Sequence, residues 1–269
     1  STDQGLSWQQ TLTSVTLWSF ARDSSGTLFA GTTNYGLYRS TDYGLTWEPV
    51  GNISDEILSL TVAPDNSLYV GTFYSGVWRS TDEGSSWIRQ NLYFSYWPTP
   101  IWLVASDPSG TIYAGAAKQG VYRSSDKGSS WNYLPSTGQA TGFSFIALSS
   151  SQFFLGTDEG IYKSPDTGKT WIHFSSNLGN VYIEDLVFSR TGKFCAVTSS
   201  GVFVSSDSAA SWVHATTGLP QGRFLSAASN AMGAFYAGAD AAGLFRSTDG
   251  GSTWFDASQG ITGLTITSI

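Results

Sequence analysis

Cysteine, histidine and basic residues are scarce in this sequence, and each shortage excludes a class of site. Cys195 is the only cysteine, so neither an intrachain disulfide nor a cysteine-ligated zinc site can form. It lies in an apolar stretch, where we expect a buried structural thiol. The two histidines, His173 and His214, each follow a repeated tryptophan by two residues, without carboxylates at metal-ligand spacing. We therefore expect no metal site and no cofactor.

Positive charge and long apolar runs are also missing. The 13 lysines and arginines form no run, and the formal net charge is −7, which argues against a nucleic-acid partner. No stretch approaches the roughly 18 apolar residues of a membrane span, so we expect no membrane insertion. Aromatic residues, by contrast, make up 15% of the chain, and 30 glycines accompany them. This mixture is typical of short strands and tight turns around an aromatic core.

A repeat of about forty residues organises the whole sequence. The pattern Ser-x-Asp-x-Gly-x-x-Trp occurs seven times, and successive copies start 39, 40, 44, 40, 41 and 42 residues apart. One copy has Ala209 in place of the glycine. We call each copy a box. The boxes lie at residues 1–8, 40–47, 80–87, 124–131, 164–171, 205–212 and 247–254.

Each repeat reads as four short β-strands with turn signals between them. In the second repeat the predicted strands are 57–62, 68–72, 76–80 and 87–89. Four-stranded antiparallel units at this period are typical of propeller blades, and we predict one all-β propeller domain over residues 1–269. Six complete units lie between Val15 and Ala257. Because a box precedes them and an isolated strand follows, we predict seven blades with one split between the termini; six is the alternative.

The conserved spacing within the box suits a folding role. An aspartate in a tight turn accepts backbone N–H bonds, the glycine supplies a positive φ, and the tryptophan buries an apolar face. We therefore interpret the box as a hairpin between the third and fourth strands of a blade. This assigns a structural role to seven aspartates: Asp3, Asp42, Asp82, Asp126, Asp166, Asp207 and Asp249.

The boxes resemble the Asp-box, or bacterial neuraminidase, repeat over almost the whole chain. Families with this repeat include sialidases, oligoxyloglucan-hydrolysing glycoside hydrolases, sortilin-type receptors and photosystem II assembly factors. The resemblance implies a propeller and leaves the function open. A sialidase is not supported, because that family requires three arginines around the substrate and only Arg223 is placed for the ligand face. The oligoxyloglucan-hydrolysing enzymes use a cleft between two propellers, and this chain supplies one.

The resemblance also implies that ligands favour the face formed by the blade-to-blade connections and the loops between second and third strands. An insertion before the third unit accounts for the spacing of 44 residues and is rich in aromatic rings. Such rings either stack on a ligand or fill the wide end of the blade interface. The same two interpretations apply to Trp18. The candidate ligand-binding residues are Tyr35, Tyr74, Tyr93, Tyr96, Trp97 and Trp102.

Acidic residues on the same face are the only candidates for catalysis. Glycoside hydrolysis needs two carboxylates across the scissile bond, and neighbouring blades could supply them. Because side chains alternate along a strand, we expect each adjacent acidic pair to give at most one carboxylate facing inward. Solvated loop charges are the alternative interpretation. The candidates are Asp55, Asp158, Glu184 and Asp185, together with the neighbouring Glu56 and Glu159.

These observations favour a non-catalytic binding or scaffold propeller over an enzyme. We expect it to recognise a glycan or a protein through the aromatic loop face, as part of a longer or multidomain bacterial protein located outside the cell or in its envelope. The alternative is a xyloglucanase-like glycoside hydrolase, or half of one, that uses the loop-face carboxylates.

Overall fold

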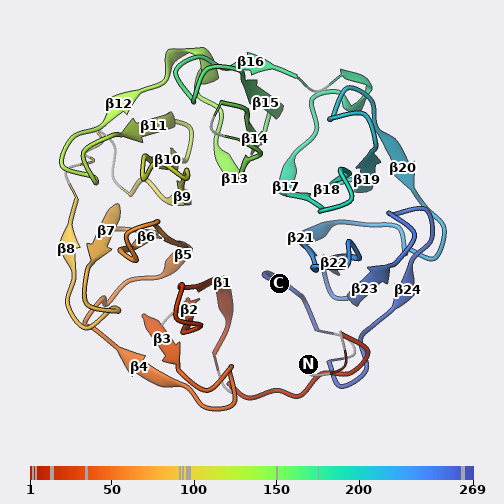
Figure 1. The fold of residues 1–269 in the computed structure, drawn as a ribbon, viewed down its shortest axis with the longest axis horizontal. Helices are drawn as coiled ribbons and strands as arrows, with labels where there is room; N and C mark the ends of the chain where they lie inside the picture. Colours follow the sequence, from red (N-terminus) through yellow and green to blue (C-terminus); the bar gives the residue numbers. More distant parts are fainter. Residues whose placement is uncertain are drawn as a thin grey trace.

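Six four-stranded antiparallel sheets form a ring around a central axis (Figure 1). The computed structural model describes residues 1, 3, 5–12, 15–33, 36–90, 92, 94, 98–149, 151–174, 176–261 and 264–269. Within these residues, each sheet pairs four strands that are consecutive in the chain, with the first strand nearest the axis and the fourth at the rim. Each sheet is thus one blade of a propeller.

The blades follow the repeats along the chain. The first three consist of β1 (Leu17–Arg22), β2 (Leu28–Thr32), β3 (Leu37–Ser40) and β4 (Glu48–Val50); β5 (Ile57–Val62), β6 (Leu68–Thr72), β7 (Val77–Ser80) and β8 (Ile88–Arg89); β9 (Ile101–Ser106), β10 (Ile112–Ala116), β11 (Gly120–Ser124) and β12 (Asn132–Tyr133). The other three consist of β13 (Gly142–Ala147), β14 (Phe153–Thr157), β15 (Gly160–Ser164) and β16 (Ile172–His173); β17 (Ile183–Phe188), β18 (Phe194–Thr198), β19 (Gly201–Ser205) and β20 (Val213–Ala215); β21 (Phe224–Ser229), β22 (Phe235–Ala239), β23 (Gly243–Ser247) and β24 (Phe255–Asp256). Two short 3-10 turns, η1 (Pro135–Thr137) and η2 (Ser176–Leu178), follow β12 and β16.

The second strand of each blade is the most deeply buried. Strands β6, β10, β14, β18 and β22 are buried at every residue, because neighbouring blades cover both of their faces. This explains why these segments are largely apolar and do not alternate. Glycine in this strand permits the close approach of the next blade: a Cβ on Gly71 would meet the backbone oxygen of Ile101 at 2.6 Å.

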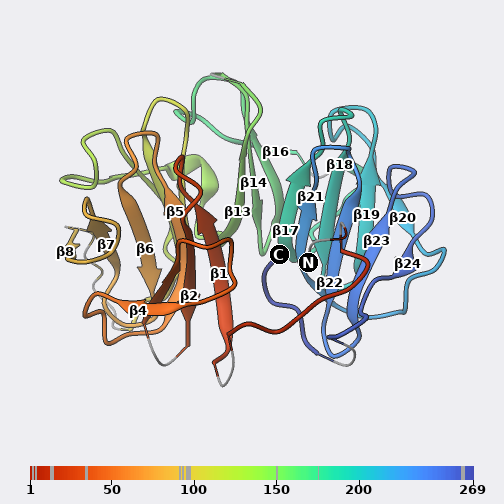
Figure 2. The same cartoon turned by 60° about the horizontal axis from the view of Figure 1, so that its bottom comes forward.

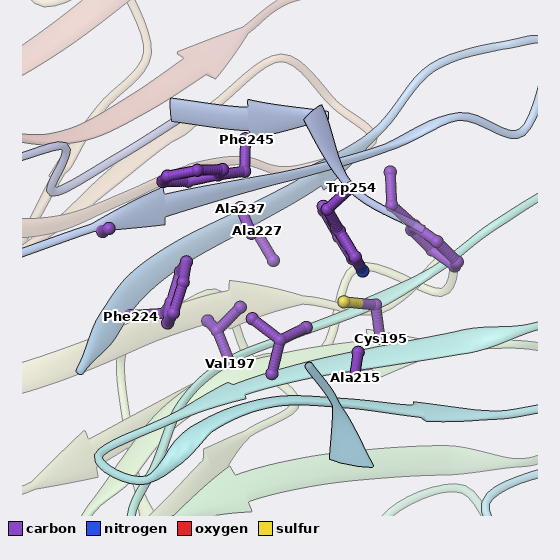
Figure 3. Close-up of a cluster of buried hydrophobic side chains, with 11 residues drawn as sticks. Cys195, Val197, Ala215, Phe224, Ala227, Ala237, Phe245 and Trp254 are labelled. Carbon is purple, nitrogen blue, oxygen red and sulfur yellow. The ribbon is translucent and has the colours of Figure 1, made fainter. Parts of the chain in front are cut away.

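The core therefore consists of layers between blades. Figure 3 shows one of them, in which Cys195 of β18 faces Trp254 of the following blade. The Cys195 side chain is fully buried, which confirms its structural role, and burial raises the pKa of its thiol. The tryptophan of this box is buried, as the sequence indicated, and it packs into the layer shared with the preceding blade.

The box is a hairpin closed by side chains. In the second blade, the Ser80 hydroxyl donates to Asp82 Oδ1 at 2.8 Å and accepts the Gly84 N–H at 2.9 Å. Asp82 also accepts the Ser86 N–H at 2.8 Å and the Ser86 hydroxyl at 2.6 Å. Equivalent bonds close the box of every blade, including the one in which Ala209 adopts a φ of 66° in the glycine position.

The prediction of seven blades is wrong, and the alternative of six is correct. Residues 264–269 lie between the first and last blades, where Ile266 packs on Gly238 as Ile101 packs on Gly71. The first box lies outside this segment, and the Trp8 N–H donates to Gln259 O at 2.8 Å. No middle strands connect the two among the described residues. Without those partners the terminal segments form no ladder, and they fill the gap between blades without making another blade.

The box gives a testable prediction for stability. Hydrogen bonds from the Ser86 hydroxyl and N–H lower the pKa of Asp82 to about 2. The charged form is therefore favoured in the folded state, and its contribution is lost as pH falls from about 4 through 2. We expect Asp82→Asn to have a lower thermal midpoint than the wild type at pH 7. The difference between the two midpoints should shrink as pH falls from about 4 to about 2.

The neighbouring Glu83→Gln is the matched control, because Glu83 makes only an ion pair at 3.3 Å with Arg39. Thermal unfolding followed by circular dichroism between pH 2 and pH 7 measures both variants. An Asp82→Asn midpoint equal to that of Glu83→Gln at every pH would show that the carboxylate does not hold the hairpin.

Candidate functional site

The loops between second and third strands meet the segments that precede the first strands. The Phe73 N–H donates to Glu56 O at 3.1 Å, and the Asp240 N–H donates to Arg223 O at 3.1 Å. The boxes meet the other end of the blades, where Lys127 forms an ion pair with Asp65 at 2.8 Å. The two groups of loops therefore lie on opposite faces, as the resemblance implied. We call the first the loop face.

A cavity of about 650 Å³ occupies the centre of the ring. Its wall includes one equivalent residue from every blade, the second residue of the first strand. At this position each first strand contains a β-bulge. In β1, for example, Leu17 pairs with Thr32 and Ser19 pairs with Gly31, so Trp18 is opposite no residue of β2. The bulge residues that line the cavity are Trp18, Leu58, Trp102, Phe143, Glu184 and Leu225.

Four aromatic rings form a continuous arc in this wall. The Trp18 and Trp102 rings are 5.9 Å apart, although the blade β5–β8 lies between their own blades. Trp102 is 6.2 Å from Phe143, and Phe143 is 5.0 Å from Tyr182. We call these four residues the aromatic arc. Because rings from blades that are not neighbours touch, the indoles must extend across the cavity and not only into the blade interface.

An ion pair stands next to the arc. Glu184 Oε1 lies 2.8 Å from the Arg223 guanidinium; the Glu184 side chain is only 10% exposed and that of Arg223 is 49% exposed. Burial raises the pKa of Glu184, although Arg223 opposes this shift. Burial also raises the pKa of Tyr182, with a further contribution from the negative charges of Asp158 and Glu184.

Asp185 follows Glu184 in β17 and belongs to the same cavity wall, next to the bulge. Both of its carboxylate oxygens accept backbone hydrogen bonds. Asp185 Oδ2 accepts the Ala227 N–H of the next blade at 2.9 Å, and Oδ1 accepts the Leu186 N–H at 2.8 Å. Burial raises the pKa of Asp185 to about 6. Its geometry is that of a link between blades.

Asp55 and Asp158 are also bonded to the backbone. Asp55 accepts the Ser75 N–H at 2.7 Å and thereby holds the loop between β6 and β7. Asp158 accepts the Thr141 N–H at 2.7 Å and holds the loop between β14 and β15 against the segment before β13. Neither residue contributes to the wall of the central cavity. The structure thus brings together Glu184 and Asp185 but not the other two acidic candidates.

The predicted aromatic residues divide into three groups. Trp102 belongs to the arc, together with Trp18. Tyr74 is 44% exposed on the loop face and packs on Phe73, outside the cavity wall. The remaining candidates lie outside the described residues: Tyr35, Tyr93, Tyr96 and Trp97.

Phe143 and Tyr182 are the residues that sequence reasoning missed. The repeat contained a signal for Phe143, because it occupies the same position in its unit as Trp18 and Trp102. Tyr182 has no such signal, since it precedes β17 and joins the arc only through its contact with Phe143.

The described part of the chain contains neither a metal-binding cluster nor a membrane-spanning helix. No group of three His, Cys, Asp or Glu side chains there is placed to hold a metal ion. His173 and His214 lie on the outer strands β16 and β20, as expected. Among the same residues, no helix has the length and apolar character needed to cross a membrane.

Comparison with protein families gives a propeller match over part of the chain. A model of the DUF6242 beta propeller domain matches residues 101–232, slightly less than half of the sequence. No curated protein matches this chain.

Solved structures give a broader match to the fold. The GH74 xyloglucanase from Xanthomonas campestris is 17% identical with a TM-score of 0.75; the match covers 89% of this chain and 45% of the enzyme. The structure of YCF48 bound to D1 peptide is 20% identical with a TM-score of 0.72, and the match covers 92% of this chain and 83% of that one. The extracellular domain of a hybrid two-component system from B. thetaiotaomicron is 18% identical with a TM-score of 0.75, over 95% of this chain and 36% of that one.

These neighbours include hydrolytic and peptide-bound propellers, and at such identities they show the fold alone. This chain spans less than half of the xyloglucanase and of the extracellular domain. The chain is therefore a β-propeller domain whose structural neighbours include GH74 xyloglucanases, YCF48 and a bacterial extracellular propeller.

The link made by Asp185 gives a second testable prediction. Ser59 accepts the Val104 N–H at 2.9 Å at the equivalent position of another blade, so Asp185→Ser should preserve the bond to Ala227. Because the pKa of Asp185 is raised, folding favours its protonated form. The resulting contribution to the free energy of unfolding is present below pH 4 and is lost as pH rises through about 6. Between pH 4 and pH 7, we expect the wild type to lose up to about 3 kcal/mol of stability relative to Asp185→Ser.

Urea unfolding at several pH values measures this difference. Asp185→Leu is the comparison variant, because it leaves the Ala227 N–H without an acceptor and should destabilise the protein by about 1–3 kcal/mol relative to Asp185→Ser. A difference between the wild type and Asp185→Ser that does not change with pH would contradict the raised pKa.

Proposed function

We propose that this propeller is a non-catalytic binding module that holds a glycan or protein ligand at the loop-face mouth of its central cavity. The aromatic arc is the observation that supports this proposal most directly. Four rings from different blades line one wall, and a cavity of about 650 Å³ lies within the range typical of ligand sites. Rings of this kind present flat apolar surface to a ligand at a low cost in conformational entropy.

The polar groups beside the arc suit recognition. Arg223 is half exposed and has donors directed by its contact with Glu184, which lies deeper in the wall. A guanidinium and a carboxylate side by side can form paired hydrogen bonds with adjacent groups of a ligand. Apolar rings with a small number of fixed polar groups are the usual composition of a specific site.

The carboxylates favour binding over catalysis. Each candidate acid already has a partner: Asp55, Asp158 and Asp185 accept backbone N–H bonds, and Glu184 pairs with Arg223. Among structural neighbours, YCF48 has been observed with a bound D1 peptide, which is consistent with a propeller of this size acting as a binding module. The extracellular or envelope location stays a prediction.

A glycoside hydrolase is the second candidate, because two acids with raised pKa values line one cavity. A raised pKa suits a general acid, and the pKa is raised at both Glu184 and Asp185. Hydrolysis also needs carboxylates on either side of the scissile bond, about 5–10 Å apart. Adjacent residues of one strand, each with a partner, meet this requirement poorly, and we therefore prefer the binding module.

A panel of polysaccharides and peptides tests the binding module. We expect Trp102→Ala and Phe143→Ala to weaken the binding of any ligand found by about tenfold or more, because each removes a ring from the centre of the site. Tyr74→Ala is the control, since it removes an aromatic ring from the same face outside the cavity. Titration calorimetry on folded variants measures the dissociation constants. Equal affinities for Trp102→Ala and Tyr74→Ala would contradict the site.

The same samples test the hydrolase. Reducing ends are measured after incubation with each polysaccharide, and we expect none to be released. Release that disappears in Glu184→Gln or Asp185→Asn would replace the binding module by the second candidate.

A further inference from the structure

Acidic residues predominate among the charges of the loop face. Its loops, with the bulge positions of the strands that follow them, contain six acidic residues and two basic ones, a net charge of −4. The remaining 14 acidic and 11 basic residues lie on the strands, their box-end turns and the boxes, where the two signs are mixed and nearly balance. The charged residues of the loop face are Asp55, Glu56, Asp158, Glu159, Glu184 and Asp240, with Lys118 and Arg223.

Negative charge reaches the aromatic arc itself. Besides burial, the charges of Asp158 and Glu184 raise the pKa of Tyr182, at one end of the arc, while Arg223 opposes them. Glu184 is a bulge residue of the cavity wall, as Trp18, Trp102 and Phe143 are. Aromatic faces attract cations through the ring quadrupole, and a nearby carboxylate strengthens that attraction. Rings and a carboxylate in one wall are therefore complementary to a positively charged group.

Arg223 already occupies the place that such a group would take. Its guanidinium pairs with the Glu184 carboxylate, while half of its side chain remains exposed. The deeply placed partner of the pair is the acid, and the more exposed partner is the base. A ligand cation could therefore displace Arg223 from Glu184 without leaving a buried charge unpaired.

We propose that the ligand is a basic peptide, whose lysine or arginine side chain enters the mouth of the cavity between the aromatic arc and Glu184. This inference rests on the proposed function and specifies its ligand. The acidic loops attract a basic chain over a longer range and repel anionic polysaccharides. A neutral glycan could accept the same short-range hydrogen bonds but would gain no long-range attraction from the six acids, so charge complementarity favours the peptide.

Two charge variants separate the ligand classes because their effects should be opposite. The probe is a fluorescein-labelled pentalysine peptide, measured by anisotropy with the folded protein. We expect Glu184→Gln to weaken binding about tenfold or more, and Arg223→Gln to strengthen it several-fold by freeing Glu184. Glu83→Gln and Lys127→Gln make the same changes in net charge on the box face, and each should leave the affinity within about twofold of the wild type.

Two further arms identify what is recognised. Pentalysine with Nε-acetylated side chains keeps the length but loses the charge, and we expect it not to bind. Raising the salt concentration from 50 to 300 mM should weaken pentalysine binding, because screening shortens the range of the attraction between the acidic loops and the peptide. If the acetylated peptide binds as tightly as pentalysine, the site does not recognise a cation, and the inference is wrong whatever the variants show.

The remaining outcomes also decide the inference. If Arg223→Gln weakens binding and Glu184→Gln strengthens it, the site takes anions and the inference is wrong. If cellohexaose binds, pentalysine does not, and Trp102→Ala abolishes the binding, the proposed module stands but its ligand is a glycan. If Trp102→Ala affects neither probe, the proposed function itself fails.

Discussion

The fourth strand of every blade depends on a carboxylate in the turn before it. Strands β8, β12, β16 and β24 contain only two residues each, which is too short for a ladder to hold them in place. In the box, the aspartate accepts hydrogen bonds from the residue four positions later, and the preceding serine caps the glycine. The hairpin therefore closes through side chains. It also places the tryptophan in the layer shared with the preceding blade, so the ring of sheets depends on it.

The inner end of the blades has a different constraint. A β-bulge at the second residue of every first strand interrupts the alternation of side chains and leaves that residue in the wall of the central cavity. Blades thus contribute to the site through one position that the fold does not require to be apolar. Four of these positions hold Trp, Trp, Phe and Glu, and the other two hold Leu. Variation at the bulge can change the cavity wall without changing the propeller.

Binding and hydrolysis make different demands on this cavity. A hydrolase needs acids whose oxygens are available to the substrate, whereas the acids here hold loops, connect blades or pair with Arg223. Their structural duties explain why these acidic residues do not form a catalytic pair. In the proposed site, the acids of the loop face and the aromatic arc together attract a cation. This division is consistent with a recognition module on a fold that also occurs in xyloglucanases.

The sequence by itself determined the blades, because the box and the β-rich runs are local signals repeated every forty residues. The predicted strands 57–62 and 68–72 are β5 and β6 of the structure, and the buried Cys195 was equally evident from its apolar neighbours. The number of blades, by contrast, could not be predicted from local signals. Seven boxes predicted seven blades, but a box and a terminal segment form no sheet without middle strands, so six resulted. The candidate site was also decided by tertiary structure. The bulge places Glu184 in the cavity wall, and its partner Arg223 comes from the segment before the next blade. Only the ring brings Trp18 against Trp102, because these two residues belong to blades far apart in the sequence.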